Sequence, residues 1–178
     1  MSISRLILRL MGWKVVNNVA AEPKCVICVA PHTSNADLFI GKLAYSALGL
    51  NAHFLMKKEW FRPPLGWLFR AMGGYPVDRS RHTSVTDQMA QAFNTHDTFR
   101  LAITPEGTRK ANADWKLGFY YIALKAGVPI HLAYIDYKTK TAGVGTRIEH
   151  LNDITSDLKT IKDFYRDKTG RYPDNFAL

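Results

Sequence analysis

The feature that most constrains the fold is a regular alternation of short apolar runs with helical patterns along the chain. Apolar runs bounded by turn residues predict strands, and apolar positions at helical spacing predict helices between them. The strands are expected at residues 24–31, 51–58, 75–79, 99–109 (running into a loop), 128–137 and 144–150. The helices are expected at residues 35–48, 83–94, 114–127 and 155–170. This pattern predicts an α/β fold with a mixed, mostly parallel sheet flanked by helices.

The length of the chain fits one domain. It has 178 residues, and no repeat, low-complexity tract or linker divides it, so we expect a single domain over residues 1–178. The formal net charge of +9 is unusual and attracts polyanions such as nucleic acid, anionic lipid or phosphorylated small molecules. No nucleic-acid-binding motif is recognisable, so we expect no nucleic-acid partner.

Two cysteines, Cys25 and Cys28, lie in an apolar run that is expected to form a strand. At strand spacing their side chains point to opposite faces of the sheet, and no second ligand pair accompanies them. We therefore predict buried free thiols and no metal site. Free thiols and the absence of a secretory signal favour a cytoplasmic protein.

The first 20 residues predict an amphipathic helix. Its apolar residues recur at helical spacing and are interrupted by cations, so they fall short of the ~20 residues that span a bilayer. The apolar positions are Ile3, Leu6, Ile7, Leu10 and Met11. The helix either covers the domain's own core or lies in a membrane interface, with Trp13 at the level of the lipid headgroups. The segment on its own favours the core.

A second segment, residues 57–70, mixes cations with aromatic side chains. Its candidate membrane contacts are Lys57, Lys58, Trp60, Phe61, Arg62 and Trp67. This mixture suits nucleic acid and also an anionic membrane surface with aromatic anchors. The pair Pro63-Pro64 within it is more typical of an interfacial loop than of a helix that reads a groove.

His32 and Asp37 stand where the first predicted strand gives way to a helix. The plain interpretation is a helix start, because Ser34 and Asp37 fit a capping box. The catalytic interpretation places His32 in the turn, folded back over the first helical turn. Asp37 would then accept a hydrogen bond from one imidazole nitrogen and leave the other free to take a proton from a substrate hydroxyl. The spacing by itself favours the structural interpretation.

Two more loops carry polar residues beyond predicted strands. In the loop at 104–110, Gly107 allows a close approach of backbone N–H groups and Arg109 offers a planar donor fork that suits phosphate. Glu106 is a candidate to orient Arg109 or to bind a glycerol hydroxyl. The alternative is a tight turn with a surface ion pair of little energetic value. Arg79 likewise follows a short strand, either as an exposed turn residue or as part of an anion site.

Together, four segments of the chain resemble, in order, the sequence blocks of the lysophospholipid acyltransferase superfamily, the glycerolipid acyltransferases of the 1-acyl-sn-glycerol-3-phosphate acyltransferase type. The segments are PHTSNAD at 31–37, GYPVDR at 74–79, TPEGTRK at 104–110 and GVPI at 127–130. Three positions depart from the family pattern: Pro31, Thr104 and Lys110 replace Asn, Phe and Ser.

The resemblance implies an enzyme of phospholipid biosynthesis, an O-acyltransferase. His32 is then the general base and Asp37 its orienting partner, with no covalent acyl-enzyme. The acyl donor is a thioester of coenzyme A or of acyl carrier protein, which is a co-substrate, and no further cofactor or metal is expected. The acceptor is a lysophospholipid, first of all 1-acyl-sn-glycerol-3-phosphate. Its phosphate and glycerol are expected to contact Arg79, Glu106, Gly107, Thr108 and Arg109.

The resemblance also implies a peripheral enzyme on the inner face of the membrane. With this context, the interpretation of the N-terminal helix moves from core packing towards a position in the membrane interface. The short chain is expected to leave little room for a deep tunnel that measures acyl chains. Two alternatives stay open. In a thioesterase, water replaces the acceptor hydroxyl. A non-catalytic protein would bind anionic lipid without any turnover.

Overall fold

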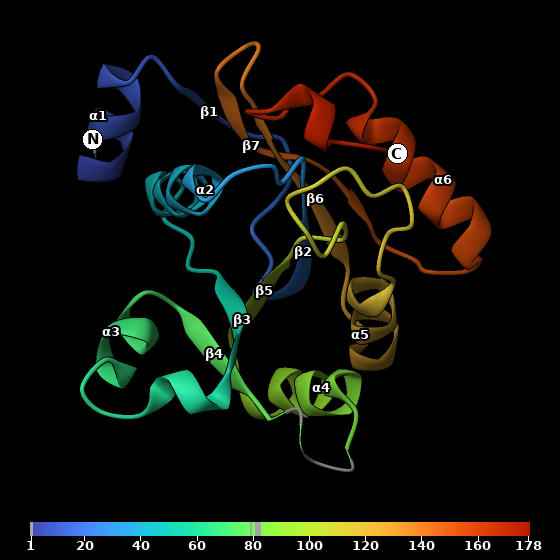
Figure 1. Ribbon diagram of the computed structural model, residues 1–178. Helices are drawn as coiled ribbons and strands as arrows, with labels where there is room; N and C mark the ends of the chain where they lie inside the picture. Colours follow the sequence, from blue (N-terminus) through green and yellow to red (C-terminus); the bar gives the residue numbers. More distant parts are fainter. Residues whose placement is uncertain (1, 79, 81–82) are drawn as a thin grey trace.

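The core of the fold is a seven-stranded sheet with the strand order β1-β7-β6-β2-β5-β3-β4 (Figure 1). The computed structural model describes residues 2–78, 80 and 83–178. The strands are β1 (Lys14–Asn17), β2 (Lys24–Ala30), β3 (His53–Lys57), β4 (Gly74–Val77), β5 (Phe99–Ile103), β6 (Ile130–Asp136) and β7 (Thr141–Ile148). Of the pairings in this described part, only β6 with β7 is antiparallel. The predicted mixed, mostly parallel sheet is confirmed.

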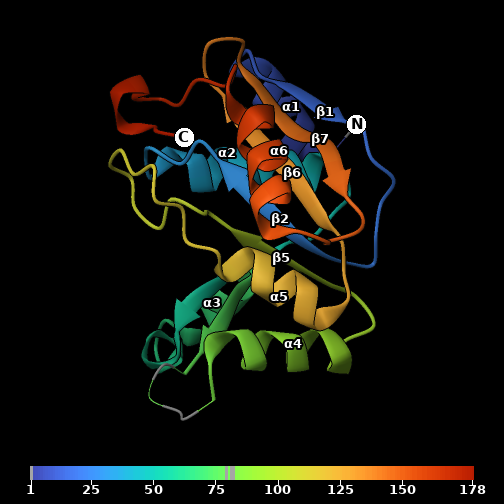
Figure 2. The same ribbon diagram turned by 90° about the vertical axis from the view of Figure 1, so that its right-hand side faces the viewer.

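Helices cover the two faces of the sheet unequally. They are α1 (Ile3–Leu10), α2 (Ala36–Ala47), α3 (Gly66–Ala71), α4 (Val85–Thr95), α5 (Gly118–Ala126) and α6 (Ile154–Tyr165), with 3-10 turns η1 (Lys58–Phe61) and η2 (Pro173–Asn175). Figure 2 shows α4, α5 and α6 in front of one face. On the other side lie α1, α2 and α3, at the left of Figure 1. Ser84 caps α4 by accepting the Asp87 N–H (3.1 Å), and Gly127 ends α5 at φ 63°.

The central strand β2 is buried on both of its faces. Cys28 packs with the core beneath α4–α6, whereas Cys25 packs with Ile27 and Tyr45 under α2. Both thiols are free and buried, as predicted, and burial raises the pKa of Cys25 to about 12. The hydroxyl of Tyr165 joins α6 to this strand by donating to the carbonyl of Cys28 (2.7 Å). The strand that leads into the His32 loop is therefore held from both sides.

The N-terminal segment differs from its prediction. The helix ends at Leu10 rather than near residue 20, because the chain turns at Gly12 (φ 79°) and residues 14–17 pair with β7 as an edge strand. The β-branched pair Val15-Val16 suits a strand. The helix covers the core only in part. In the described part of α1, Leu8 is buried in a cluster with Ile40 and Ala44 of α2, whereas Ile3 is 78% and Leu10 80% exposed.

Two of the residues predicted to contact a membrane are buried. Trp13 is 7% exposed and packs edge-on against Tyr137, because the turn at Gly12 carries its indole back towards the sheet. Phe61 is 8% exposed and contacts Phe69 and the guanidinium of Arg70. The other candidates, Lys57, Lys58, Trp60, Arg62 and Trp67, are exposed. Among the described residues, no helix is long and apolar enough to cross a membrane.

Candidate active site

The sequence motifs meet because β2 and β5 are parallel neighbours. Cys28 pairs with Ile103, so the loops that follow the two strands leave the sheet at the same edge. The chain runs from β2 to β3 on one side and from β5 to β6 on the other side of β2. A reversal of strand order of this kind opens a crevice at the carboxyl ends of the strands, where α/β proteins bind ligands.

His32 and Asp37 form the pair that the catalytic interpretation predicted. Nδ1 of His32 lies 3.2 Å from Oδ2 of Asp37. His32 lies in the turn before α2, which begins at Ala36, so its ring folds back over the first helical turn. The Asp37 side chain is only 2% exposed, whereas that of His32 is 23% exposed. The histidine therefore faces the accessible side of the pair, with its Nε2 atom away from the carboxylate.

Four hydrogen bonds in addition to the histidine hold the Asp37 carboxylate. Oδ2 accepts the backbone N–H groups of Thr33 and Ser34 (both 2.8 Å), and Oδ1 accepts the hydroxyls of Ser34 (2.9 Å) and Tyr137 (2.7 Å). Burial raises the pKa of Asp37, but the hydrogen bonds from His32, Tyr137 and Ser34 outweigh it and lower the pKa below its usual value. Asp37 is therefore a fixed anion.

This arrangement keeps one half of the predicted capping box, because Asp37 accepts the backbone N–H of Ser34 (2.8 Å), and corrects the other half. The residue that precedes α2 as its cap is Asn35, and no side chain caps the helix there. The Ser34 hydroxyl donates to the Asp37 carboxylate instead of accepting from the helix backbone. Ser34 and Asp37 thus shape the turn that carries His32, rather than only starting the helix.

Glu106 lies beneath the histidine instead of pairing with Arg109. Its side chain is buried, at 2% exposure, and Oε1 accepts the backbone N–H of His32 at 2.8 Å. Oε2 is buried with no hydrogen-bond partner among the described residues. Burial raises the pKa of Glu106 to about 7, opposed by the N–H of His32 and assisted by the charge of Asp37. Glu106 therefore supports the His32 loop from within the protein.

Residues 107–110 of the loop are exposed and adjoin the start of α2. Gly107 has φ 65°, which suits glycine, as the predicted turn requires. Arg109 donates a hydrogen bond to Oδ1 of Asn35, next to the His32 loop, while Thr108 accepts the N–H of Lys110 at 3.3 Å. The structure thus brings Gly107, Thr108 and Arg109 to the same edge of the sheet as His32. Their contact with an acceptor stays a prediction.

The motif after β4 is described only in part. Asp78 accepts hydrogen bonds from the backbone and hydroxyl of Ser80, and these lower the pKa of Asp78 to about 2, with help from Lys58 at 3.3 Å. Arg79, predicted to bind the acceptor, lies outside the described residues. Within the described residues, no three His, Cys, Asp or Glu side chains gather as a metal site would require.

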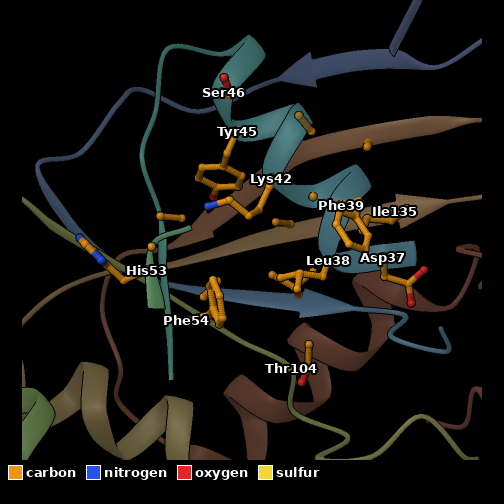
Figure 3. A pocket seen from close by; sticks show the side chains of 18 of the residues that line it. Asp37, Leu38, Phe39, Lys42, Tyr45, Ser46, His53, Phe54, Thr104 and Ile135 are labelled. Carbon is orange, nitrogen blue, oxygen red and sulfur yellow. The ribbon is translucent and has the colours of Figure 1, made fainter. Parts of the chain in front are cut away.

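A cavity of about 1030 Å³ adjoins the pair, between α2 and strands β2, β5 and β3. His32, Asp37 and Thr104 are among the residues that line it. The middle is apolar, with Leu38 and Phe39 of α2 opposite Phe54 of β3 (Figure 3). The end away from Asp37 is more polar and is lined by Lys42, Tyr45, Ser46 and His53. The cavity is larger than the short chain led us to expect.

The C-terminal segment also supports the site, which motif analysis missed because this segment carries no motif. Thr33 accepts the backbone N–H of Tyr172 at 3.2 Å. Gly170 packs so closely that a Cβ there would lie 2.7 Å from the Thr33 side chain. Tyr137 donates its backbone N–H to Thr169 (2.9 Å). The segment at 169–172 therefore packs against the turn that carries His32.

Comparison with known sequences decides the family. Residues 13–135, more than half of the chain, match the sequence model of the family described as Acyltransferase. The chain belongs to the acyltransferase family. The matched range contains His32, Asp37 and the whole 104–110 loop.

Two relatives agree with this assignment. This chain is 27% identical over 125 residues to the 1-acyl-sn-glycerol-3-phosphate acyltransferase of Saccharomyces cerevisiae. The aligned region covers 66% of this chain and 40% of the yeast protein. The chain thus spans about two fifths of the length of that relative. It is also similar in fold to the crystal structure of PlsC, the 1-acyl-sn-glycerophosphate acyltransferase of Thermotoga maritima. That match has a TM-score of 0.64 at 17% identity and covers 90% of this chain and 73% of PlsC.

The burial of Glu106 predicts a pH dependence of stability. Its pKa is about 7 in the folded protein, above the ordinary value of 4.5. Between these values the folded state retains a proton that the unfolded chain releases, so this group's contribution to stability is lost as the pH rises. Glu106→Gln keeps the acceptor for His32 but does not titrate. The free energy of unfolding of the variant, relative to wild type, should rise by as much as ~3 kcal/mol from pH 4.5 to about pH 8 in urea titrations. Parallel curves for the two proteins would contradict the assignment.

The packing of Gly170 predicts that Gly170→Ala destabilises the turn that carries His32. The added methyl group overlaps the Thr33 side chain, so we expect a loss of ~1–3 kcal/mol in the free energy of unfolding and slower turnover. Gly118→Ala is the matched control, because a Cβ at Gly118 meets no atom within 4 Å. Equal stabilities of the two variants would argue against the contact.

Proposed function

We propose that this enzyme transfers a fatty acyl group from an acyl thioester to the hydroxyl of a lysophospholipid, with 1-acyl-sn-glycerol-3-phosphate as the first candidate acceptor. The observation that carries the proposal is the contact of His32 Nδ1 with the buried, ionised Asp37 in the lining of a large, partly apolar cavity. Nδ1 bears the proton that Asp37 accepts, so Nε2 is the free base.

In the proposed reaction, Nε2 of His32 takes the proton of the acceptor hydroxyl as its oxygen attacks the thioester carbonyl carbon. The tetrahedral intermediate collapses, the C–S bond breaks, and the thiol leaves with the proton that His32 returns. Asp37 stays ionised throughout and stabilises the imidazolium that forms between the two proton transfers. The acyl group passes directly to the acceptor, so no protein nucleophile is needed.

The acceptor's phosphate is proposed to bind at the exposed part of the 104–110 loop. Arg109 stands beside the start of α2, and Gly107 is exposed and has no side chain. The N–H of Gly107 itself donates to the carbonyl of Thr104 (3.3 Å), so the guanidinium of Arg109 is the candidate phosphate donor here. A guanidinium suits phosphate because two of its N–H groups can donate in parallel. Arg79, Thr108 and Glu106 complete the set predicted from the family, with Glu106 acting through the backbone of His32.

The cavity under α2 is proposed to take an acyl chain. Its volume of about 1030 Å³ is at the upper end of the ~300–1,000 Å³ usual for ligand pockets. Leu38, Phe39 and Phe54 give it an apolar middle next to the His–Asp pair. An acyl thioester whose chain lies there would bring its carbonyl carbon to His32. The donor is a thioester of coenzyme A or of acyl carrier protein.

The side of the protein with α1, α2 and α3 is proposed to dock on the inner face of a membrane. Ile3 and Leu10 of α1 are exposed, and so are Phe39, Trp60 and Trp67. Ile3 and Leu10 belong to α1, Phe39 to α2 and Trp67 to α3, the helices at the left of Figure 1, and Phe39 also lines the cavity. The exposed cations Lys57, Lys58 and Arg62 are close to Trp60 in the chain and would attract anionic headgroups. Both lipid substrates would then reach the site from the membrane.

The proposal predicts that His32→Ala lowers kcat for acyl transfer by ~10²–10⁴-fold, because no general base remains. The assay follows phospholipid product by mass spectrometry, with lysophospholipid acceptors offered against acyl-CoA and acyl-carrier-protein donors. The matched control is His150→Ala, at an exposed position beyond β7.

The same assay separates the alternatives. Thioester cleavage that does not depend on added lysophospholipid would identify a thioesterase. Vesicle binding without any turnover would identify a lipid-binding protein. A His32→Ala variant with wild-type transfer would remove the histidine from the mechanism.

Docking through α1 predicts that Ile3→Asp combined with Leu10→Asp weakens binding to vesicles of phosphatidylglycerol and phosphatidylethanolamine. Each aspartate replaces an exposed apolar side chain with a charge, so we expect at least a tenfold loss in flotation or sedimentation assays. Leu124→Asp is the control, since Leu124 is 50% exposed on α5, across the sheet. Equal binding by both variants would rule out α1 as the docking element.

A further inference from the structure

Tyr137 donates a hydrogen bond to Asp37 although the two residues are far apart in the sequence. It follows β6 directly, and its hydroxyl donates to Oδ1 of Asp37 at 2.7 Å across 100 positions of sequence. Among the described residues, the other groups that contact the Asp37 carboxylate belong to residues 32–34. Tyr137 therefore ties the His32 turn to a different part of the sheet.

The position of Tyr137 is fixed on several sides. Its backbone N–H donates to the carbonyl of Thr169 (2.9 Å), and the N–H of Thr169 donates to the buried carboxylate of Asp136 (3.1 Å). Its ring meets the indole of Trp13 edge-on, with centroids 5.0 Å apart. Trp13 is anchored in turn, because its backbone N–H donates to Leu8 of α1 (2.8 Å).

The tyrosine acts as a donor over the whole working pH range. Burial, its hydrogen bond to Asp37 and the charge of that carboxylate raise the pKa of Tyr137 to about 12. The Tyr137 and Ser34 hydroxyls donate to Oδ1 of Asp37, while Oδ2 accepts the N–H groups of Thr33 and Ser34 and faces Nδ1 of His32. The Tyr137 hydroxyl is thus one of the donors that fix the orientation of the carboxylate towards the imidazole.

We propose that Tyr137 is a positioning residue for the His32–Asp37 pair and that Trp13 holds its ring in place. The inference rests on the proposed function, since it assigns a role in the same reaction. In this proposal, contacts connect α1 to His32. They run from Leu8 of α1 to Trp13, from Trp13 to Tyr137, and from Tyr137 to Asp37.

The first test is Tyr137→Phe, which keeps the ring against Trp13 and removes only the hydroxyl. We expect kcat to fall about tenfold with KM unchanged, because the residue orients the pair and touches no substrate. The NMR signal of the proton between His32 and Asp37 should shift in the variant. Tyr121→Phe, on the exposed side of α5, is the matched control.

The second test is a double-mutant cycle with Trp13→Ala. If Trp13 acts through the tyrosine hydroxyl, it lowers kcat in the wild-type background but has little further effect in Tyr137→Phe. Losses that multiply independently would show that Trp13 contributes only to packing. Thermal unfolding of all four proteins shows that the comparison is made on folded protein.

The outcomes separate this inference from the proposed function. If His32→Ala abolishes acyl transfer while Tyr137→Phe has wild-type kcat and an unmoved proton signal, the function stands and the role of Tyr137 is overturned. If His32→Ala keeps wild-type transfer, the proposed mechanism itself fails. A fall in kcat, a shifted signal and non-additive Trp13 effects together support the positioning role.

Discussion

The hydrogen bonds to the buried carboxylate of Asp37 organise the candidate site. Two backbone N–H groups and two hydroxyls converge on this side chain. Burial raises its pKa, but the hydrogen bonds from His32, Tyr137 and Ser34 together hold it below the usual value. The same bonds close the turn that carries His32 and present Oδ2 to its Nδ1 atom. A buried anion without such donors would be costly, so the geometry of the turn and the charge of the pair depend on each other.

Glu106 shows the contrast between two carboxyl groups that contact the same turn. It is as buried as Asp37, but its one hydrogen bond from His32 does not offset burial, and its pKa is raised to about 7. Two fully ionised carboxylates beside one imidazole would repel each other, and the charge of Asp37 contributes to the shift. The environments therefore keep Asp37 ionised, whereas Glu106 retains its proton up to about pH 7.

The sequence predicted the part of the site that depends on local pattern. The His32 turn and the Gly107 turn were expected because polar residues follow apolar strands, and parallel strands bring such loops together. It did not predict that Glu106 points inward, since burial depends on the neighbouring strand. Trp13 was misassigned because residues 13–17 continue an apolar helical pattern, although they form a buried turn and an edge strand. Tyr137 and Gly170 reach the site only through long-range packing, which no local pattern encodes.

The unequal covering of the sheet explains how α1, the proposed membrane-docking helix, can influence the chemistry. The face under α4–α6 is closed by a continuous core, whereas the face under α1 and α2 combines a cavity with exposed apolar side chains. The contacts from Leu8 through Trp13 and Tyr137 to Asp37 lie on that open face. Packed rings and a hydrogen bond connect α1 to the His32–Asp37 pair. If α1 docks on a membrane as proposed, a change in its position there would alter the orientation of His32. Acyl transfer would then depend on the interface for the geometry of its base as well as for its substrates.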